Sequence, residues 1–158
     1  MKSDQDLYKR LRDLPKEQLW ESEVPRFDAA SPRERMQGVA LIRALGSIFS
    51  RFGTEEEKAA VRGWLMALLK DPQEKIRRYA MAALPKIGGD EGAEAQMLSL
   101  LQENGGEREK RHLGLALEKI GGSATLSFMA QGEALPELTQ QKVQAAIARR
   151  ENPGTVEL

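Results

Sequence analysis

The sequence has no cysteine and a single histidine, His112, among its 158 residues. Without cysteine the chain cannot form a disulfide, use a thiol nucleophile or hold a cysteine-ligated zinc or iron–sulfur site. One histidine excludes a two-histidine metal site and a histidine relay, and its position at the edge of an apolar helix face predicts a packing role. We therefore expect no bound metal.

Long apolar runs are also missing. No run approaches the roughly 18–20 residues that cross a membrane, and the polar start of the chain is not followed by the apolar segment of a signal peptide. Hydrophobic residues make up 41% and charged residues 30% of the chain, which is typical of a globular protein. We expect a cytoplasmic protein with no membrane partner.

Aromatic residues are scarce, at 5%, and alternating runs rich in Val, Ile and Thr are absent, so β-strands are not expected. Ala, Leu, Glu, Arg, Lys and Gln dominate, and these are strong helix formers. N-cap residues predict helix starts at Ser31-Pro32, Thr54 and Asp71-Pro72. Helices are predicted near 4–13, 32–51, 55–70, 73–87, 91–103, 107–120, 124–131 and 136–150, with a short helical turn at 16–21 and a loop at 22–30.

An internal repeat organises the chain. Residues 77–89 align without a gap with residues 110–122, which lie 33 positions later, and seven of the thirteen aligned positions are identical. A period in the thirties that holds two helices is typical of a helical solenoid. No single helix pair can bury both of its faces, so neighbouring pairs are expected to stack on a shared core.

The segment from Leu65 to Gly88, with its Leu68-Leu69-Lys-Asp71-Pro start and its Ile76-Arg77…Ala83-Leu84…Ile87 helix, resembles the HEAT repeat. Its short spacing resembles the phycobilisome-lyase type of HEAT-like repeat. The resemblance implies an all-α, right-handed α–α superhelix (solenoid) of about four HEAT-like helix pairs, whose second helices line the concave face. It assigns Asp71 and Arg77 to a ladder that bridges within and between repeats.

This interpretation divides the chain into three parts. Residues 1–30 are expected to form N-terminal capping helices and a loop, residues 31–150 the repeat solenoid, and residues 151–158 a tail or linker. Aromatic and Met side chains at helical spacing are expected in the core rather than in a ligand site. They are Phe49, Phe52, Trp64, Met81, Met97 and Phe128.

No catalytic constellation is found. Phosphate-binding glycine motifs are absent, and no carboxylate has the apolar surroundings that prepare it for acid–base work. We therefore predict a protein that is not an enzyme and that uses no cofactor.

The distribution of charge is the feature that suggests a function as well as a fold. Net charge is zero, yet the candidate second helices, 31–49, 72–88, 107–120 and 137–151, hold fourteen of the 24 Lys and Arg and only seven of the 24 acidic residues. At 100° per residue, bases from the two aligned repeats fall on one flank of their helices. We call these bases the basic stripe: Lys75, Arg78, Lys86, Arg108, Arg111 and Lys119.

A basic concave face suits a polyanion or an acidic protein segment. The simpler alternative is a solvated helix face on which glutamates pair with these bases at i+3 or i+4. We expect a non-enzymatic HEAT-like scaffold that binds a macromolecule on this face. A protein partner is favoured, and nucleic acid is the alternative.

Two other functions stay open. The charged, Pro-Gly-containing end at 150–158 suits a linker, which would make the chain a recruitment or regulatory domain of a larger enzyme, one that modifies nucleic acid for example. The lyase-type relatives handle tetrapyrroles, so a tetrapyrrole-handling protein is the third hypothesis.

Overall fold

Helices make up almost all of the structure, a computed structural model that describes residues 4–88, 91–103, 106–131, 135 and 137–151. No strand occurs among these residues, so the all-α prediction is confirmed for them. The chain divides after Gly88 into two compact units, each with its own core. None of the helices in the described ranges is long and apolar enough to cross a membrane.

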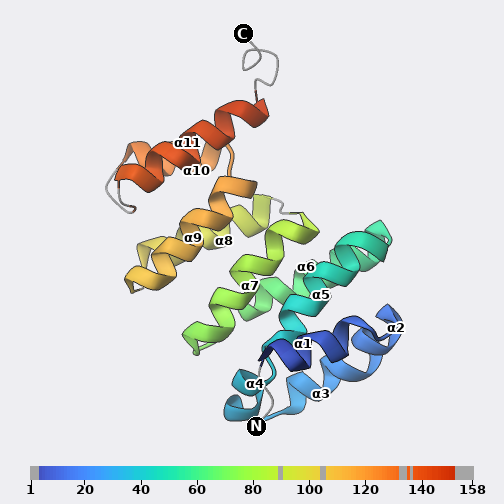
Figure 1. Ribbon diagram of the computed structural model, residues 1–158. Coiled ribbons are helices and arrows are strands. Elements are labelled where there is room, and N and C mark those ends of the chain that lie inside the picture. The colour runs from blue at the N-terminus through green and yellow to red at the C-terminus, as the bar shows by residue number, and fades with distance from the viewer. Residues whose placement is uncertain (1–3, 89–90, 104–105, 132–134, 136, 152–158) are drawn as a thin grey trace. The chain divides into compact units, whose positions relative to one another are not determined.

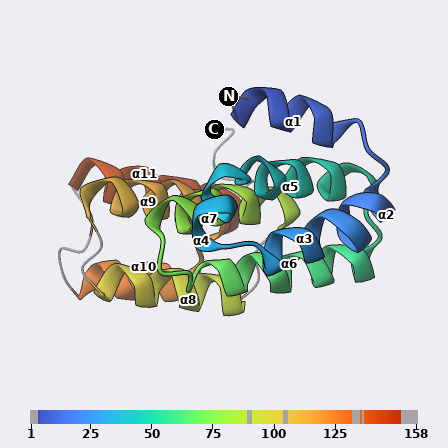
Figure 2. The same ribbon diagram turned by 90° about the horizontal axis from the view of Figure 1, so that it is seen from below.

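The first unit places α5 between two other helices (Figure 2). On one side α5 packs against α1, on the other against α6, and α7 lies beside it. The helices of this unit are α1 (Asp4–Arg12), α2 (Lys16–Gln18), the π-helical turn η1 (Leu19–Glu23), α3 (Val24–Ala29), α4 (Pro32–Gln37), α5 (Ala40–Phe52), α6 (Glu55–Leu68) and α7 (Glu74–Ile87).

Two of the three predicted helix starts, at Ser31 and Thr54, are confirmed as capping boxes, whereas the N-cap predicted at Asp71 is wrong because α7 begins at Glu74 after Gln73. The Ser31 hydroxyl accepts a hydrogen bond from the backbone N–H of Glu34, whose carboxylate accepts from the backbone N–H of Ser31. Thr54 and Glu57 form the same reciprocal pair at the start of α6. Each box satisfies two backbone donors that the first helical turn would leave unpaired.

The predicted helix at 32–51 is broken, and the prediction of one continuous helix is wrong. A turn at Gly38 and Val39 separates α4 from α5. Glycine has weak helix propensity, and the turn places Val39 in the core, where its side chain is fully buried. Burial of that side chain stabilises the turn.

The predicted loop at 22–30 is also wrong, because these residues continue η1 and form α3. Val24 and Phe27 are buried, and the Phe27 ring meets Trp64 edge-on with 5.5 Å between ring centroids. The Trp64 indole N–H donates to the Asp28 carboxylate at 2.9 Å. Tertiary contacts with α6 therefore hold a segment whose local sequence favours a loop.

α5 and α7 pack closely in the core of the first unit. A Cβ atom built on Gly46 would lie 3.1 Å from the Cβ of Ala83, so the two helices approach closely through small residues. Leu45, Ile76 and Leu84 are fully buried nearby in the same helices. α7 then ends at Gly88, which adopts a positive φ of 98° that side chains rarely tolerate.

In its described residues the second unit has two layers of two helices each (Figure 2). α9 packs against α11 in one layer, and α8 and α10 pair in the other. Their bounds are α8 (Glu91–Gln102), α9 (Glu107–Ile120), α10 (Ser123–Ala130) and α11 (Glu137–Glu151). The predicted tail at 151–158 lies outside the described residues, apart from Glu151 at the end of α11.

A buried carboxylate joins α8 to α10. Glu94 is 7% exposed and accepts hydrogen bonds from the backbone N–H of Gly122 at 2.7 Å, the backbone N–H of Thr125 at 3.0 Å and the Thr125 hydroxyl at 2.5 Å. Because glycine at the N-cap position offers no side-chain acceptor, the carboxylate from α8 caps α10.

Candidate polyanion-binding surface

Two members of the basic stripe are paired with acids inside the first unit. The Lys75 ammonium lies 3.5 Å from the Asp4 carboxylate of α1, and Nε of Arg78 lies 3.8 Å from the Glu74 carboxylate one turn earlier in α7. Only 18% of the Arg78 side chain is exposed. Their pairing reduces the positive charge that they offer to a ligand.

Lys86, the third stripe residue of the first unit, is exposed and lines a polar hollow among α1, α5 and α7 with a volume of about 550 Å³. Three cations face this hollow against one carboxylate, that of Asp13. We call it the basic hollow and define it by Tyr8, Arg12, Ser47, Arg51, Phe52 and Lys86. Figure 1 shows α1 lying beside α5 in the first unit, which is how α1 contributes to this surface.

Tyr8 lies in positive electrostatic potential. The Arg43 guanidinium stands 4.0 Å from the centroid of the Tyr8 ring and that of Arg12 stands 5.9 Å from it. The Tyr8 hydroxyl lies 3.2 Å from the Ser47 hydroxyl, to which it donates. Once Tyr8 ionises, the Ser47 hydroxyl donates to the phenolate oxygen; this bond and the charges of Arg43, Lys86 and Arg12 favour the phenolate and lower the pKa of Tyr8 below its ordinary value.

Phe52 departs from its predicted place in the core. It is the last residue of α5, it is 62% exposed, and it is one of the residues that line the basic hollow. Phe49, one turn earlier, is buried as predicted, as are Met81 and Met97. The helix end turns the last aromatic ring of the apolar stripe outward, and periodicity along a helix does not show that.

The other three stripe residues belong to the second unit. Arg108, Arg111 and Lys119 are all exposed on α9. His112 is half-buried beside them, and its Nδ1 lies 2.8 Å from the backbone oxygen of Arg108. The six predicted residues thus lie on two helices of separate units.

Asp71 and Arg77, the predicted ladder, meet at the start of α7. Asp71 is buried, and its carboxylate accepts from Arg35 of α4 at 3.3 Å and from the backbone N–H of Gln73 at 2.8 Å. The Arg77 guanidinium donates to the backbone oxygen of Asp71 at 2.7 Å. These bonds connect α4 to the loop before α7.

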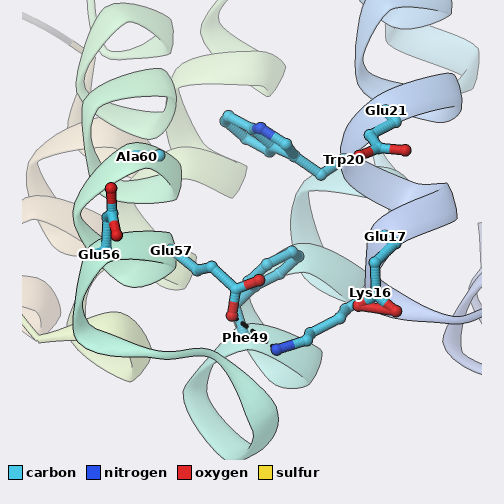
Figure 3. A pocket seen from close by; sticks show the side chains of 8 residues that line it. All are labelled: Lys16, Glu17, Trp20, Glu21, Phe49, Glu56, Glu57 and Ala60. Atoms are coloured by element: carbon cyan, nitrogen blue, oxygen red, sulfur yellow. Dashed lines mark hydrogen bonds and ion pairs between the residues drawn. The ribbon is translucent and has the colours of Figure 1, made fainter.

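A second pocket in the first unit has the opposite charge (Figure 3). Its volume is about 240 Å³, and Figure 3 shows glutamates from two sides of it around the Trp20 and Phe49 rings, whose centroids are 6.3 Å apart. On one wall the Lys16 ammonium contacts the Glu57 carboxylate at 2.6 Å and the backbone oxygen of Phe52 at 2.9 Å. The hydrogen bond from Lys16, with that from the backbone N–H of Thr54, lowers the pKa of Glu57.

The periodicity of α7 identified Lys86 but missed Tyr8, Arg12 and Arg51. Tyr8 and Arg12 come from α1, whose packing on α5 depends on contacts between residues far apart in the chain. A signal was present, because α1 combines a basic last turn with an aromatic residue. Across the described residues, no group of three or more histidines or carboxylates is arranged to hold a metal ion.

Comparison with known proteins identifies no relative of the chain. No family model, no curated protein and no solved structure matches the chain.

Proposed function

We propose that the chain is a non-enzymatic helical scaffold that binds an anionic macromolecule, with the basic hollow of the first unit as a contact surface. The observation that supports it is the excess of three cations, Arg12, Arg51 and Lys86, over the one carboxylate that lines the same hollow. Clustered positive charge in a concave surface raises the local concentration of anions and accelerates their association.

The proposal includes a HEAT-like solenoid as the architecture. Residues 77–87 and 110–120 of the aligned segments lie in α7 and α9, which follow α6 and α8 in the order expected for second helices of repeats. The bond from Arg35 to the Asp71 carboxylate joins one candidate repeat to the next, and the bond from Arg77 to the Asp71 carbonyl lies within the second of them. The order of the aligned helices supports a repeat, and the bond from Arg35 to Asp71 supports repeat stacking in the first unit.

Salt-dependent binding of labelled polyanions tests the proposal. Fluorescence anisotropy is measured for the full chain with an oligo-glutamate peptide, single-stranded RNA and double-stranded DNA, from 50 to 200 mM salt. We expect binding that weakens steeply with salt, because each phosphate contact releases counterions. Arg12→Glu with Lys86→Glu should abolish it, whereas Lys70→Glu, at an exposed position outside the hollow, should have a much smaller effect. Absence of binding to every probe would make the basic stripe a solvated face.

A further inference from the structure

An exposed aromatic ring accompanies the cations of the basic hollow. Phe52 is 62% exposed although it belongs to the residue type that proteins bury most readily, and it lines the same hollow as Arg12, Arg51 and Lys86. The negative face of an aromatic ring does not attract the carboxylates of an acidic protein segment. A nucleotide presents both an anionic phosphate and a flat base that stacks on aromatic rings.

The polar groups of the hollow divide into those already bonded and those available to a ligand. The Tyr8 hydroxyl donates to Ser47, and the Ser50 hydroxyl donates to the backbone oxygen of Ser47 at 2.9 Å. Lys86 and Arg51 are exposed, and Arg12, which lies 5.9 Å from the Tyr8 ring, keeps its guanidinium at the surface. The hydroxyls therefore hold the walls in place, while the three cations face solvent.

Size also favours a nucleotide. A volume of about 550 Å³ far exceeds a lone carboxylate and lies within the roughly 300–1,000 Å³ of pockets that take small organic ligands. The lone acid, Asp13, leaves the lining with a net positive charge.

We propose that the basic hollow binds one nucleotide unit of a single-stranded nucleic acid, with Arg12, Arg51 and Lys86 at the phosphate and the Phe52 ring against the base. This inference rests on the proposed function, because it names the class of anion that the hollow takes. The specific combination of ring and cations in one hollow distinguishes it from a purely electrostatic surface.

An abasic oligonucleotide separates the two contacts. Anisotropy is measured for the full chain with a fluorescein-labelled single-stranded RNA and with an abasic strand of the same length, which has the same phosphates and no bases. Stacking on an aromatic side chain contributes about 1–3 kcal/mol per base, so the abasic strand should bind roughly 5- to 150-fold more weakly.

Matched variants assign that difference to Phe52. Phe52→Leu should weaken binding of the RNA by about 5-fold or more and leave binding of the abasic strand unchanged, whereas Phe52→Trp should retain RNA binding. Leu138→Ala, at a side chain that is 65% exposed in the second unit, is the control for loss of an exposed apolar group. Lys86→Glu should weaken both strands and reduce the slope of log K against log salt by about 1.

The outcomes distinguish this inference from the proposed function. Equal affinity for the RNA and the abasic strand, or equal loss of both in Phe52→Leu, overturns base stacking but leaves a polyanion-binding surface. Binding of the oligo-glutamate peptide without binding of RNA does the same. If no polyanion binds, both proposals are wrong. Far-UV circular dichroism of each variant verifies that it is folded.

Discussion

Replacing Glu94 should destabilise the second unit more than the same replacement of an exposed glutamate does. The Glu94 carboxylate accepts from two backbone N–H groups and one hydroxyl, all at the start of α10. Glu94→Ala leaves these three donors without an acceptor, and each buried donor so orphaned costs about 1–3 kcal/mol. Water entering the space left by the side chain recovers part of that, so we expect a loss of about 3–5 kcal/mol in the free energy of unfolding.

Urea denaturation followed by far-UV circular dichroism measures this loss. With an m-value of about 2 kcal/mol/M, the midpoint for Glu94→Ala should fall by about 2 M. Glu94→Gln keeps one carbonyl acceptor and should lose about 1–2 kcal/mol. Both tryptophans, Trp20 and Trp64, belong to the first unit, so their fluorescence reports on that unit while ellipticity reports on the whole chain.

Glu103→Ala provides the matched control, because it removes an exposed carboxylate just beyond the end of α8. It should change the stability by no more than about 0.5 kcal/mol. If Glu94→Ala and Glu103→Ala denature at the same urea concentration, the carboxylate does not cap α10 and the reasoning is refuted.

Three further predictions concern packing, helix register and titration. Gly63 faces open space on α6, so Gly63→Ala should raise the free energy of unfolding by about 1 kcal/mol. A Cβ on Gly114 would lie 2.7 Å from a side-chain methyl of α11, so Gly114→Ala should lower it by about 1–3 kcal/mol. Thermal melts that rank the two variants the other way contradict this packing. Leu84→Ala should cost about 2–5 kcal/mol in urea melts and Lys86→Glu little, and equal losses would contradict the register of α7. The tyrosinate absorbance that Tyr8→Phe removes should titrate below pH 10.0, since the pKa of Tyr8 is lowered in the folded chain. The stabilisation from the Tyr8 phenolate is then present above the unfolded-state pKa and is lost as the pH falls through the folded-state pKa. Titration of Tyr8 at or above pH 10.0 would contradict the positive potential at its ring.

Helix positions followed from the sequence wherever the determinants are local. The capping boxes at Ser31 and Thr54 and the apolar spacing of α6, α7 and α9 are written within a few residues of each element. The failures at 22–30 and at Gly38 have a different cause. There the conformation depends on burial of Val39 and on the contact of Phe27 with Trp64, which join distant segments.

The candidate site was predictable only in part for the same reason. Helical geometry identified Lys75, Arg78 and Lys86 as one flank of α7. It could not show that Asp4 of α1 would pair with Lys75, or that Arg12 would join Lys86 instead. Charge on one helix is a local property, whereas its availability depends on what packs against that helix.

The origin of the basic hollow from α1, α5 and α7 has a consequence for the history of the repeat. Duplication of a helix pair can copy Lys86 into its counterpart Lys119, but it cannot copy Tyr8 or Arg12, which precede the repeated segment. A ligand that depends on the hollow would therefore be bound once per chain, however many repeats the chain acquired.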